Sequence, residues 1–511
     1  MRQKIRQAAQ LPFMRKILWF FDSLWYPAVY ALLALVSSFT GMEIAFYALT
    51  AVIVVFTAVF SRDSKPLLAP VFMAVYAVSW VHTPQPPFSD DFFYTRGVQI
   101  YFLCLGALLI ACMLFRFIVF PQDRNFFKES KLRLGIVLMT AAFLLNGVFF
   151  GGYTINNLPF GLLMALSFFV FYIYFFNTLR TDEGAGMYAG YLLVMTAGII
   201  FLQLCKIYLF DDIIVDGSAN KDILVAGWGM SNNIGGMLGM FLPACFFVAA
   251  KRQRFGWIFY VLGFIFLGGV ALTLSRTSLL ISGLITVAAA IYLSIAKSPV
   301  RKFARIFNIA VIVVGIVLLI ALWDYVRDLF AVFFERGFDD SGRFELWANG
   351  IRNFLRAPLF GVGFYEPLKY PDEIENWVFP DMYHNIFIQM LASCGIFGLI
   401  AYVVHILQVA FAVKRNPTPE SLFYIVILLS MFGMSLLDNH IFHVFPAMVY
   451  SVFLLLSERE GEDGPLLLLR PLLVKLLRRK KGMEGDVAEG AAGSCTNSMP
   501  VRHEDKNSGM S

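Results

Sequence analysis

Long apolar runs, separated by short polar breaks, make up most of the first 460 residues of the chain. A hydrocarbon core about 30 Å thick is crossed by roughly 20 apolar residues in a helix, and most of the runs are about that long. The pattern predicts an all-α integral membrane protein with about fourteen membrane-spanning helices. They lie near residues 18–38, 42–60, 67–81, 97–118, 133–150, 159–179, 187–209, 229–250, 255–274, 277–295, 306–323, 385–412, 421–437 and 443–457.

The basic residues give these helices an orientation. Cytoplasmic loops of membrane proteins carry an excess of Lys and Arg. With the N-terminus on the cytoplasmic side, 31 of the 41 Lys and Arg fall on that side, so both termini are predicted to be cytoplasmic. The run at 67–81 is short and could instead be a re-entrant segment, which leaves twelve to fourteen crossings compatible with the pattern.

Composition excludes a soluble protein, because 59% of the residues are hydrophobic and only 15% are charged, against about 25% charged in soluble domains. The net charge of +6 follows from the inside bias of the basic residues and does not indicate a nucleic-acid partner. Five of the six cysteines lie inside apolar runs and no CxxC pair occurs, which argues against disulfides and a zinc site.

The chain divides by composition into four parts. Residues 1–17 are a basic cytoplasmic segment without a cleavage pattern, and residues 18–457 form the polytopic domain. Residues 458–481 alternate Leu with Lys and Arg, which suits a segment lying on an anionic cytoplasmic leaflet. Residues 482–511 are rich in Gly, Ser, Glu and Asp and are predicted to be disordered.

A sixty-residue external segment, 324–383, separates the eleventh and twelfth helices, whereas connections in helical bundles are mostly a few residues long. Its middle has a helical period of apolar residues and should form an amphipathic helix, which either lies on the membrane surface or caps the bundle. The apolar face comprises Phe344, Trp347, Ile351, Phe354 and Leu355, the polar face comprises Glu345, Asn349, Arg352 and Arg356, and Pro358, Gly361 and Gly363 stop the helix.

Two arginines are candidate anion ligands. Arg343 lies at the shoulder of this apolar face beside Trp347, where a charge needs a partner. Arg276 stands between two apolar stretches with almost no loop, and an ionisable residue near membrane depth is a functional hypothesis by default. The alternative for Arg276 is a turn residue whose side chain reaches the interface.

His384 is the candidate general base. It is predicted to occupy the first turn of the twelfth helix, where the positive end of the helix dipole disfavours imidazolium. A neutral imidazole can accept a proton near pH 7, and the free amides of that turn could meet a phosphate. The alternative is an interfacial histidine with an ordinary hydrogen bond.

Weaker signals are polar residues in three other outer segments, which usually act as caps and solvated turns. The two histidines of the last outer turn are spaced i, i+3, but no cysteine or carboxylate cluster completes a metal site, so no metal is predicted. These residues are Asp438, His440 and His443; Asn232 and Asn233; and Asp90 and Asp91.

Four of these motifs, in this order, resemble the O-antigen ligase and polymerase family of membrane glycosyltransferases. The resemblance covers roughly residues 229–400, and Asn232 in the segment before the eighth helix also looks like the family. The motifs are Ser275-Arg276, Gly342-Arg343-Phe-Glu-Leu-Trp347, Pro358-Leu-Phe-Gly361-Val-Gly363 and His384-Asn385.

The resemblance implies transfer of a glycan from undecaprenyl diphosphate to an acceptor hydroxyl at the external face of a bacterial inner membrane, with inversion and without metal or cofactor. Arg276 and Arg343 would bind the diphosphate and His384 would activate the acceptor, with Ser275, Trp347, Asn385 and Asn232 in supporting positions. The acceptor could be a lipid, another glycan or a protein, so ligase and polymerase both stay open. We expect the two arginines and His384 to face one outward-opening cavity beneath the loop helix.

Two other functions compete with this interpretation. A flippase for lipid-linked oligosaccharides would also use many helices and a cationic interior, although the two halves of the chain show no matching repeats with broken helices. A metal-dependent glycosyltransferase that uses a lipid monophosphate sugar would need an acidic pair, for which Asp90 and Asp91 are the candidates.

Overall fold

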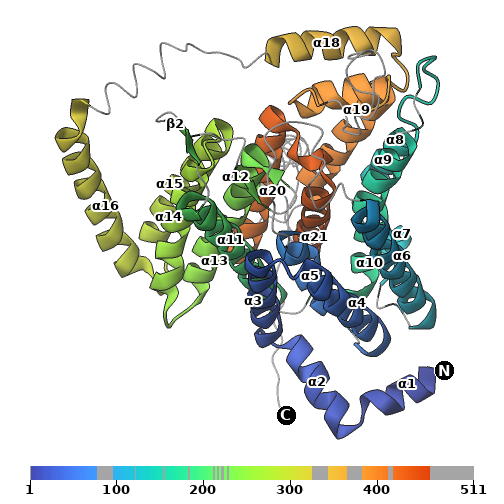
Figure 1. Cartoon of the computed structure of the whole chain (residues 1–511), viewed down its shortest axis with the longest axis horizontal. Helices are drawn as coiled ribbons and strands as arrows, with labels where there is room; N and C mark the ends of the chain where they lie inside the picture. The colour runs from blue at the N-terminus through green and yellow to red at the C-terminus, as the bar shows by residue number, and fades with distance from the viewer. Residues whose placement is uncertain are drawn as a thin grey trace, which may run out of the picture.

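The computed structural model of the chain is helical almost throughout, as the apolar pattern predicts (Figure 1). It describes residues 2–61, 63–77, 96–120, 122, 124–153, 155, 157–181, 184–210, 213–215, 218–219, 224–226, 229–324, 343–364, 382–412 and 418–460. Two short antiparallel ladders precede α12, and the apolar pattern did not predict them. They pair β1 (Ile214–Val215) with β2 (Ser218–Ala219) and β3 (Val225–Ala226) with β4 (Gly229–Met230).

Eight helices in the described part of the chain are long and apolar enough to cross a membrane. Two of them are composite, because a π-helical turn interrupts one and Pro243 begins the second half of the other. The eight are α4 (Glu43–Phe60), α9 (Asn157–Ala165) continued by η4 (Leu166–Val170) and α10 (Phe171–Thr178), α11 (Ala185–Phe210), α12 (Ser231–Phe241) continued by α13 (Pro243–Lys251), α15 (Arg276–Ile295), α16 (Arg301–Ala321), α19 (Ile386–Ala412) and α20 (Pro419–Asp438).

The other helices are not among these eight, and all of them except α6 have 17 residues or fewer. Each of the fourteen ranges predicted from the sequence overlaps a helix, while the count of fourteen crossings stays a prediction. These helices are α1 (Arg2–Ala9), α2 (Pro12–Asp22), α3 (Trp25–Thr40), η1 (Lys65–Leu67), α5 (Leu68–Met73), η2 (Ala74–Ala77), α6 (Arg96–Val119), α7 (Phe126–Glu129), α8 (Arg133–Leu144), α14 (Gly256–Leu272), α18 (Arg343–Arg356), η6 (His440–Phe442) and α21 (Val444–Glu460).

The first predicted helix, 18–38, is not continuous, because α2 and α3 meet at an angle of 71°. Ser23 adopts extended backbone after α2, and its hydroxyl donates to the carbonyl of Phe20, 2.7 Å away. Phe21 then stacks on Phe56 of α4, which fixes α2 across the end of that helix. The apolar pattern runs through the bend and therefore does not reveal it.

One helix lies at the edge of the bundle. Figure 1 shows α16 apart from the other helices, and only 6% of its most apolar window is buried. It has the highest mean hydropathy of the eight long helices. Apolar residues exposed on all sides of a helix are expected where the surroundings are lipid, so α16 supports a membrane location.

A break in α19 gives the Pro-x-x-Gly-x-Gly motif a structural role. Gly395 leaves the helical conformation, with φ 65° and ψ −163°. The amide of Val362 donates to Ala392 O at 2.9 Å and the amide of Gly363 to Ser393 O at 3.1 Å, while Ile396 N donates to Pro358 O at 2.8 Å. The motif thus supplies hydrogen bonds that the break removes, and it fixes the first half of α19.

The amphipathic stretch predicted between the eleventh and twelfth helices is helical and lies against α19 as α18 (Figure 1). It ends at Arg356, just before the Pro-x-x-Gly-x-Gly motif. Its buried positions are Gly350 and Asn353, and Asn353 Nδ2 donates to the hydroxyl of Tyr383, 2.8 Å away. Phe344 and Leu355 are 67% and 69% exposed. The helix therefore contacts the bundle through a small and polar stripe and leaves much of its apolar face open.

Several predictions from the sequence fall on residues outside the described part. These are the remainder of the external segment 324–383, Asp90 and Asp91, the first glycine of the Gly342-Arg343 motif, and the C-terminal residues after Glu460, which include the segments 461–481 and 482–511.

Candidate functional site

Three helices begin and one ends around a single region, which we call the site end of the bundle: α12, α15 and α19 begin there and α20 ends there. A Cβ on Gly235 of α12 would lie only 3.1 Å from the Cβ atoms of Ser275 and Ser278, at the start of α15. A Cβ on Gly236 would collide with the imidazole of His440, two residues after α20. The glycines of α12 thus bring the Ser275-Arg276 turn and the end of α20 to the two sides of one helix.

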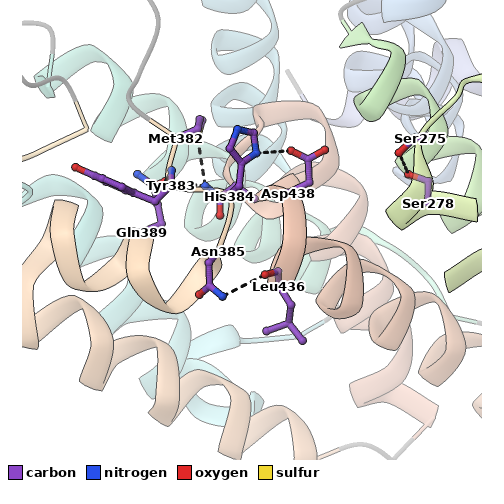
Figure 2. A network of polar contacts seen from close by, with 10 residues as sticks. Ser275, Ser278, Met382, Tyr383, His384, Asn385, Gln389, Leu436 and Asp438 are labelled. Carbon is purple, nitrogen blue, oxygen red and sulfur yellow. Dashed lines mark hydrogen bonds and ion pairs between the residues drawn. The ribbon is translucent and has the colours of Figure 1, made fainter. Parts of the chain in front are cut away.

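The central contact of the site end joins His384 to Asp438. His384 Nδ1 lies 2.7 Å from Asp438 Oδ1, and Figure 2 shows the second ring nitrogen pointing away from the carboxylate. The histidine side chain is 35% exposed, whereas that of Asp438 is 9% exposed. A proton on Nδ1 that is donated to the carboxylate leaves a lone pair on Nε2. The arrangement is that of a base held by a buried acid.

The structure places His384 two residues before α19, which begins at Ile386, and not in the first turn as predicted. The reason is its left-handed backbone, with φ 51°, which α-helix does not allow. The helix dipole argument for a neutral imidazole therefore weakens, since the dipole acts mainly within the first turn.

Strained backbone marks three positions at the site end. Besides His384, Leu274 has φ 58° beside the Ser275-Arg276 turn and Asn439 has φ 47° directly after Asp438. Within the described ranges only one other non-glycine residue, Phe255, has positive φ. A leucine in this region is rare, and such conformations persist where the surrounding structure imposes them, often at functional sites.

Asn385, predicted to support the site, connects two helices. Its Oδ1 accepts hydrogen bonds from the amides of Phe387 and Ile388, at 3.0 and 3.2 Å, which caps the first turn of α19. Its Nδ2 donates to the carbonyl of Leu436, 3.2 Å away near the end of α20. Asn385 therefore helps to hold the segment that carries His384 against the helix that carries Asp438.

The Ser275-Arg276 motif forms the turn between α14 and α15. Ser275 is the residue before α15, is 4% exposed, and its hydroxyl donates to Ser278 Oγ at 2.8 Å (Figure 2). Arg276 is the first residue of α15 and its side chain is exposed. The buried serine pair stabilises the turn and leaves the guanidinium accessible.

Arg343 and Trp347 lie on the first two turns of α18. Both are half-buried, as expected for the shoulder of the apolar face. The indole Nε1 of Trp347 is buried without a hydrogen-bond acceptor among the described residues. Asn232 is half-buried in the first turn of α12, where no side chain caps the free amides. That Arg276, Arg343 and His384 face one outward-opening cavity stays a prediction.

Two more histidines follow Asp438. His440 is 2% exposed and neither ring nitrogen has a hydrogen-bond partner in the part of the chain that the structure describes. Burial lowers the pKa of His440, and burial with the neighbouring His440 lowers the pKa of His443 to about 4. Across the described ranges, no group of three or more His, Cys, Asp or Glu is arranged to hold a metal ion.

Sequence reasoning undervalued Asp438, which it treated as a helix cap or solvated turn. The available signal was an acid at the end of a long apolar helix, because a buried carboxylate requires a partner. The pattern could not name that partner, since His384 lies 54 residues earlier in the chain.

Residues 239–403 match the family model described as O-antigen ligase. This part of the chain is similar to O-antigen ligases. The matched range includes Arg276, Arg343 and His384, whereas Asn232 and Asp438 lie outside it. No curated protein sequence matches the chain. This match confirms the resemblance inferred from the motifs. The many apolar helices indicate a membrane protein. Similarity to the O-antigen ligase family implies a glycosyltransferase-like enzyme with a lipid-linked glycan substrate.

Proposed function

We propose that the protein transfers a glycan from undecaprenyl diphosphate to an acceptor hydroxyl, as an inverting, metal-independent ligase or polymerase of surface polysaccharides. The observation that carries the proposal is the contact of His384 with Asp438, at 2.7 Å, in a chain with a region similar to O-antigen ligases. A half-exposed imidazole held by a buried carboxylate is suited to remove a proton from a hydroxyl.

In this reaction the acceptor oxygen attacks the anomeric carbon from the face opposite the diphosphate. A bond forms between that carbon and the acceptor oxygen, and the bond from the carbon to the phosphate oxygen breaks. Undecaprenyl diphosphate leaves with the electron pair, and His384 Nε2 takes the proton of the hydroxyl. Asp438 stabilises the imidazolium that results, because its carboxylate accepts the Nδ1 hydrogen bond.

The two arginines would bind the diphosphate. Arg276 begins α15 and Arg343 begins α18, so each guanidinium stands beside the positive end of a helix dipole. Arginine presents a rigid fork that matches phosphate oxygens and stays charged. Stabilising the charge that develops on the leaving group is the kind of electrostatic effect worth several kcal/mol, roughly 3 per donor.

The proposed setting is the external face of a bacterial inner membrane, with both termini cytoplasmic. The distribution of Lys and Arg along the chain supports this setting, with the starts of α12, α15 and α19 on the external side. The acceptor is a hydroxyl of a lipid, a glycan or a protein.

The experiment is glycan transfer from a purified undecaprenyl diphosphate oligosaccharide in reconstituted vesicles, with EDTA present. We expect wild type to form a covalent product, and His384→Ala to lower the rate by about 10²- to 10⁴-fold because the general base is lost. Arg343→Lys should also lower the rate, since lysine cannot make the forked contact. Melting temperatures of the variants should match wild type.

Two results would overturn the proposal. If the donor lipid crosses the bilayer unchanged and no covalent product forms, the protein is a flippase and the arginines are charges on its path. If EDTA abolishes transfer, the reaction depends on a metal.

A further inference from the structure

Beneath the contact of His384 with Asp438 lies a buried amide that the sequence analysis did not consider. Gln389 is in the first half of α19, is 0% exposed, and its side chain points back toward the start of the helix (Figure 2). A polar side chain in an apolar helix is costly to bury without hydrogen bonds, so its partners indicate why it is there.

The oxygen of this amide binds the neighbours of both site residues. Gln389 Oε1 accepts a hydrogen bond from the amide of Tyr383, at 2.9 Å, and Tyr383 directly precedes His384. The same oxygen accepts from Nδ2 of Asn439, at 2.7 Å, and Asn439 directly follows Asp438. One atom thus connects the segment that carries the base to the turn that carries the acid.

The other end of the amide fixes its orientation. Gln389 Nε2 donates to Ser393 Oγ at 2.9 Å, one turn further along α19. The backbone amide of Tyr383 can only donate, so the oxygen of Gln389 must face Tyr383 and the nitrogen then faces the Ser393 hydroxyl, which can accept. Ser393 in turn has its carbonyl bonded to Gly363, so the amide rests on the rigid break of α19.

The two segments need such a connection because both are strained. His384 and Asn439 have φ 51° and 47°, in the left-handed region that residues other than glycine adopt less readily. Without an external hold, either residue could relax to a negative φ, and the neighbouring side chain would turn away. The contact of His384 with Asp438 depends on both backbones staying in place.

We propose that Gln389 is a positioning residue, which holds His384 and Asp438 together by binding the residue next to each of them. This role rests on the proposed function, since it acts on the proposed base. Gln389 itself does not touch the reacting atoms.

The variant that tests this is Gln389→Met, which keeps the length of the side chain and removes the acceptor oxygen. We expect kcat for glycan transfer to fall by about 10- to 100-fold with an unchanged KM for the donor, because small misplacements of a catalytic group have effects of that size. Gln389→Glu keeps the acceptor oxygen and lets the Ser393 hydroxyl donate instead, so it should retain most of kcat.

The matched control is Gln203→Met. Gln203 is a buried glutamine of α11, 6% exposed, whose Nε2 donates to the carbonyl of Tyr76, far from the site residues in sequence. Its loss should lower the melting temperature by less than the loss of Gln389, because one hydrogen bond is removed instead of three, and it should leave kcat unchanged.

A double variant separates positioning from general stability. In the Asp438→Asn background the contact that Gln389 maintains is already impaired, so adding Gln389→Met should lower kcat by less than twofold. If Gln389→Met lowers kcat by the same factor in both backgrounds, the residue does not act through the contact of His384 with Asp438 and the proposal is wrong.

A second readout does not require turnover. The rate at which diethylpyrocarbonate modifies His384 in the purified protein, followed by mass spectrometry, reports how firmly its ring is held. Gln389→Met should raise this rate severalfold and Gln203→Met should not. If wild type transfers no glycan but Gln389→Met still raises the modification rate of His384, the proposed function is wrong and the positioning role stands. If Gln389→Met leaves the modification rate unchanged, the positioning role is wrong.

Discussion

Two buried carboxylates, at opposite ends of the bundle, are held in different ways. Glu458, near the end of α21, is 2% exposed and accepts hydrogen bonds from the hydroxyls of Ser130 and Tyr172 and from the amide of Lys131. These donors come from the α7–α8 connection and α10, so the carboxylate ties three segments together. Asp438 binds an imidazole that stays 35% exposed.

We expect this difference to separate a structural acid, Glu458, from an acid that takes part in the proposed reaction, Asp438. The donors around Glu458 are buried hydroxyl and backbone groups, and within the described residues no strained backbone adjoins them. Asp438 faces a group that can exchange a proton with a ligand, and its surroundings include left-handed backbone at His384 and Asn439. Burial of a carboxylate is therefore uninformative by itself; the exposure and backbone strain of its partner distinguish the two cases.

The largest effect expected from this comparison is on turnover. Asp438→Asn should lower glycan transfer by about 10²- to 10⁴-fold, because the amide neither fixes the tautomer of His384 nor stabilises imidazolium. Transfer in vesicles and the melting temperature are the measurements. Glu458→Gln is the matched control and should transfer at the wild-type rate per folded molecule. Equal losses in the two variants would show that the acids do not differ in role.

The second effect is on stability at the opposite end. Glu458→Ala removes the common acceptor of Ser130, Lys131 and Tyr172. A buried donor left unpaired costs about 1–3 kcal/mol, so the free energy of unfolding should fall by roughly 3 kcal/mol or more. Thermal unfolding in detergent measures this, and Glu458→Gln, which keeps one acceptor oxygen, should lose less. An unchanged melting temperature for Glu458→Ala would contradict the structural role.

The smallest effect is a pH dependence of stability at the site end. Burial lowers the pKa of His443 to about 4, below its ordinary value near 6.5. Between these values the unfolded chain binds a proton that the folded protein excludes, so stability falls as the pH is lowered from about 6.5 to about 4. Melting temperatures at several pH values should show this slope, and His443→Leu should flatten it. If His443→Leu leaves the slope unchanged, groups other than His443 cause the pH dependence.

The segment 324–383 shows what a sequence pattern can predict and what it cannot. The period of Phe344, Trp347 and Ile351 predicted α18, and Pro358 with its glycines predicted where it ends. The face that packs on α19 differs from the predicted apolar face, because Gly350 and Asn353 fit against Tyr383 and Ile388. Shape and one hydrogen bond determined this contact, and a hydropathy pattern contains neither.

The same limit explains why the sequence pattern did not single out Gln389. Its position in an apolar run was visible, but its partners Tyr383 and Asn439 lie 6 and 50 residues away and come together only in the folded chain. Local periodicity cannot show which of several buried polar groups share a hydrogen bond.

Apolar run length and short ordered motifs are local properties of the chain, so the amino-acid sequence alone predicted a helical membrane protein with a region similar to O-antigen ligases. It also named Arg276, Arg343 and His384. The contact of His384 with Asp438, the meeting of the starts of α12, α15 and α19 with the end of α20, and the strained backbone around them could be seen only in the folded protein. Those features depend on contacts between distant segments, and packing forces fix them only once the helices have assembled.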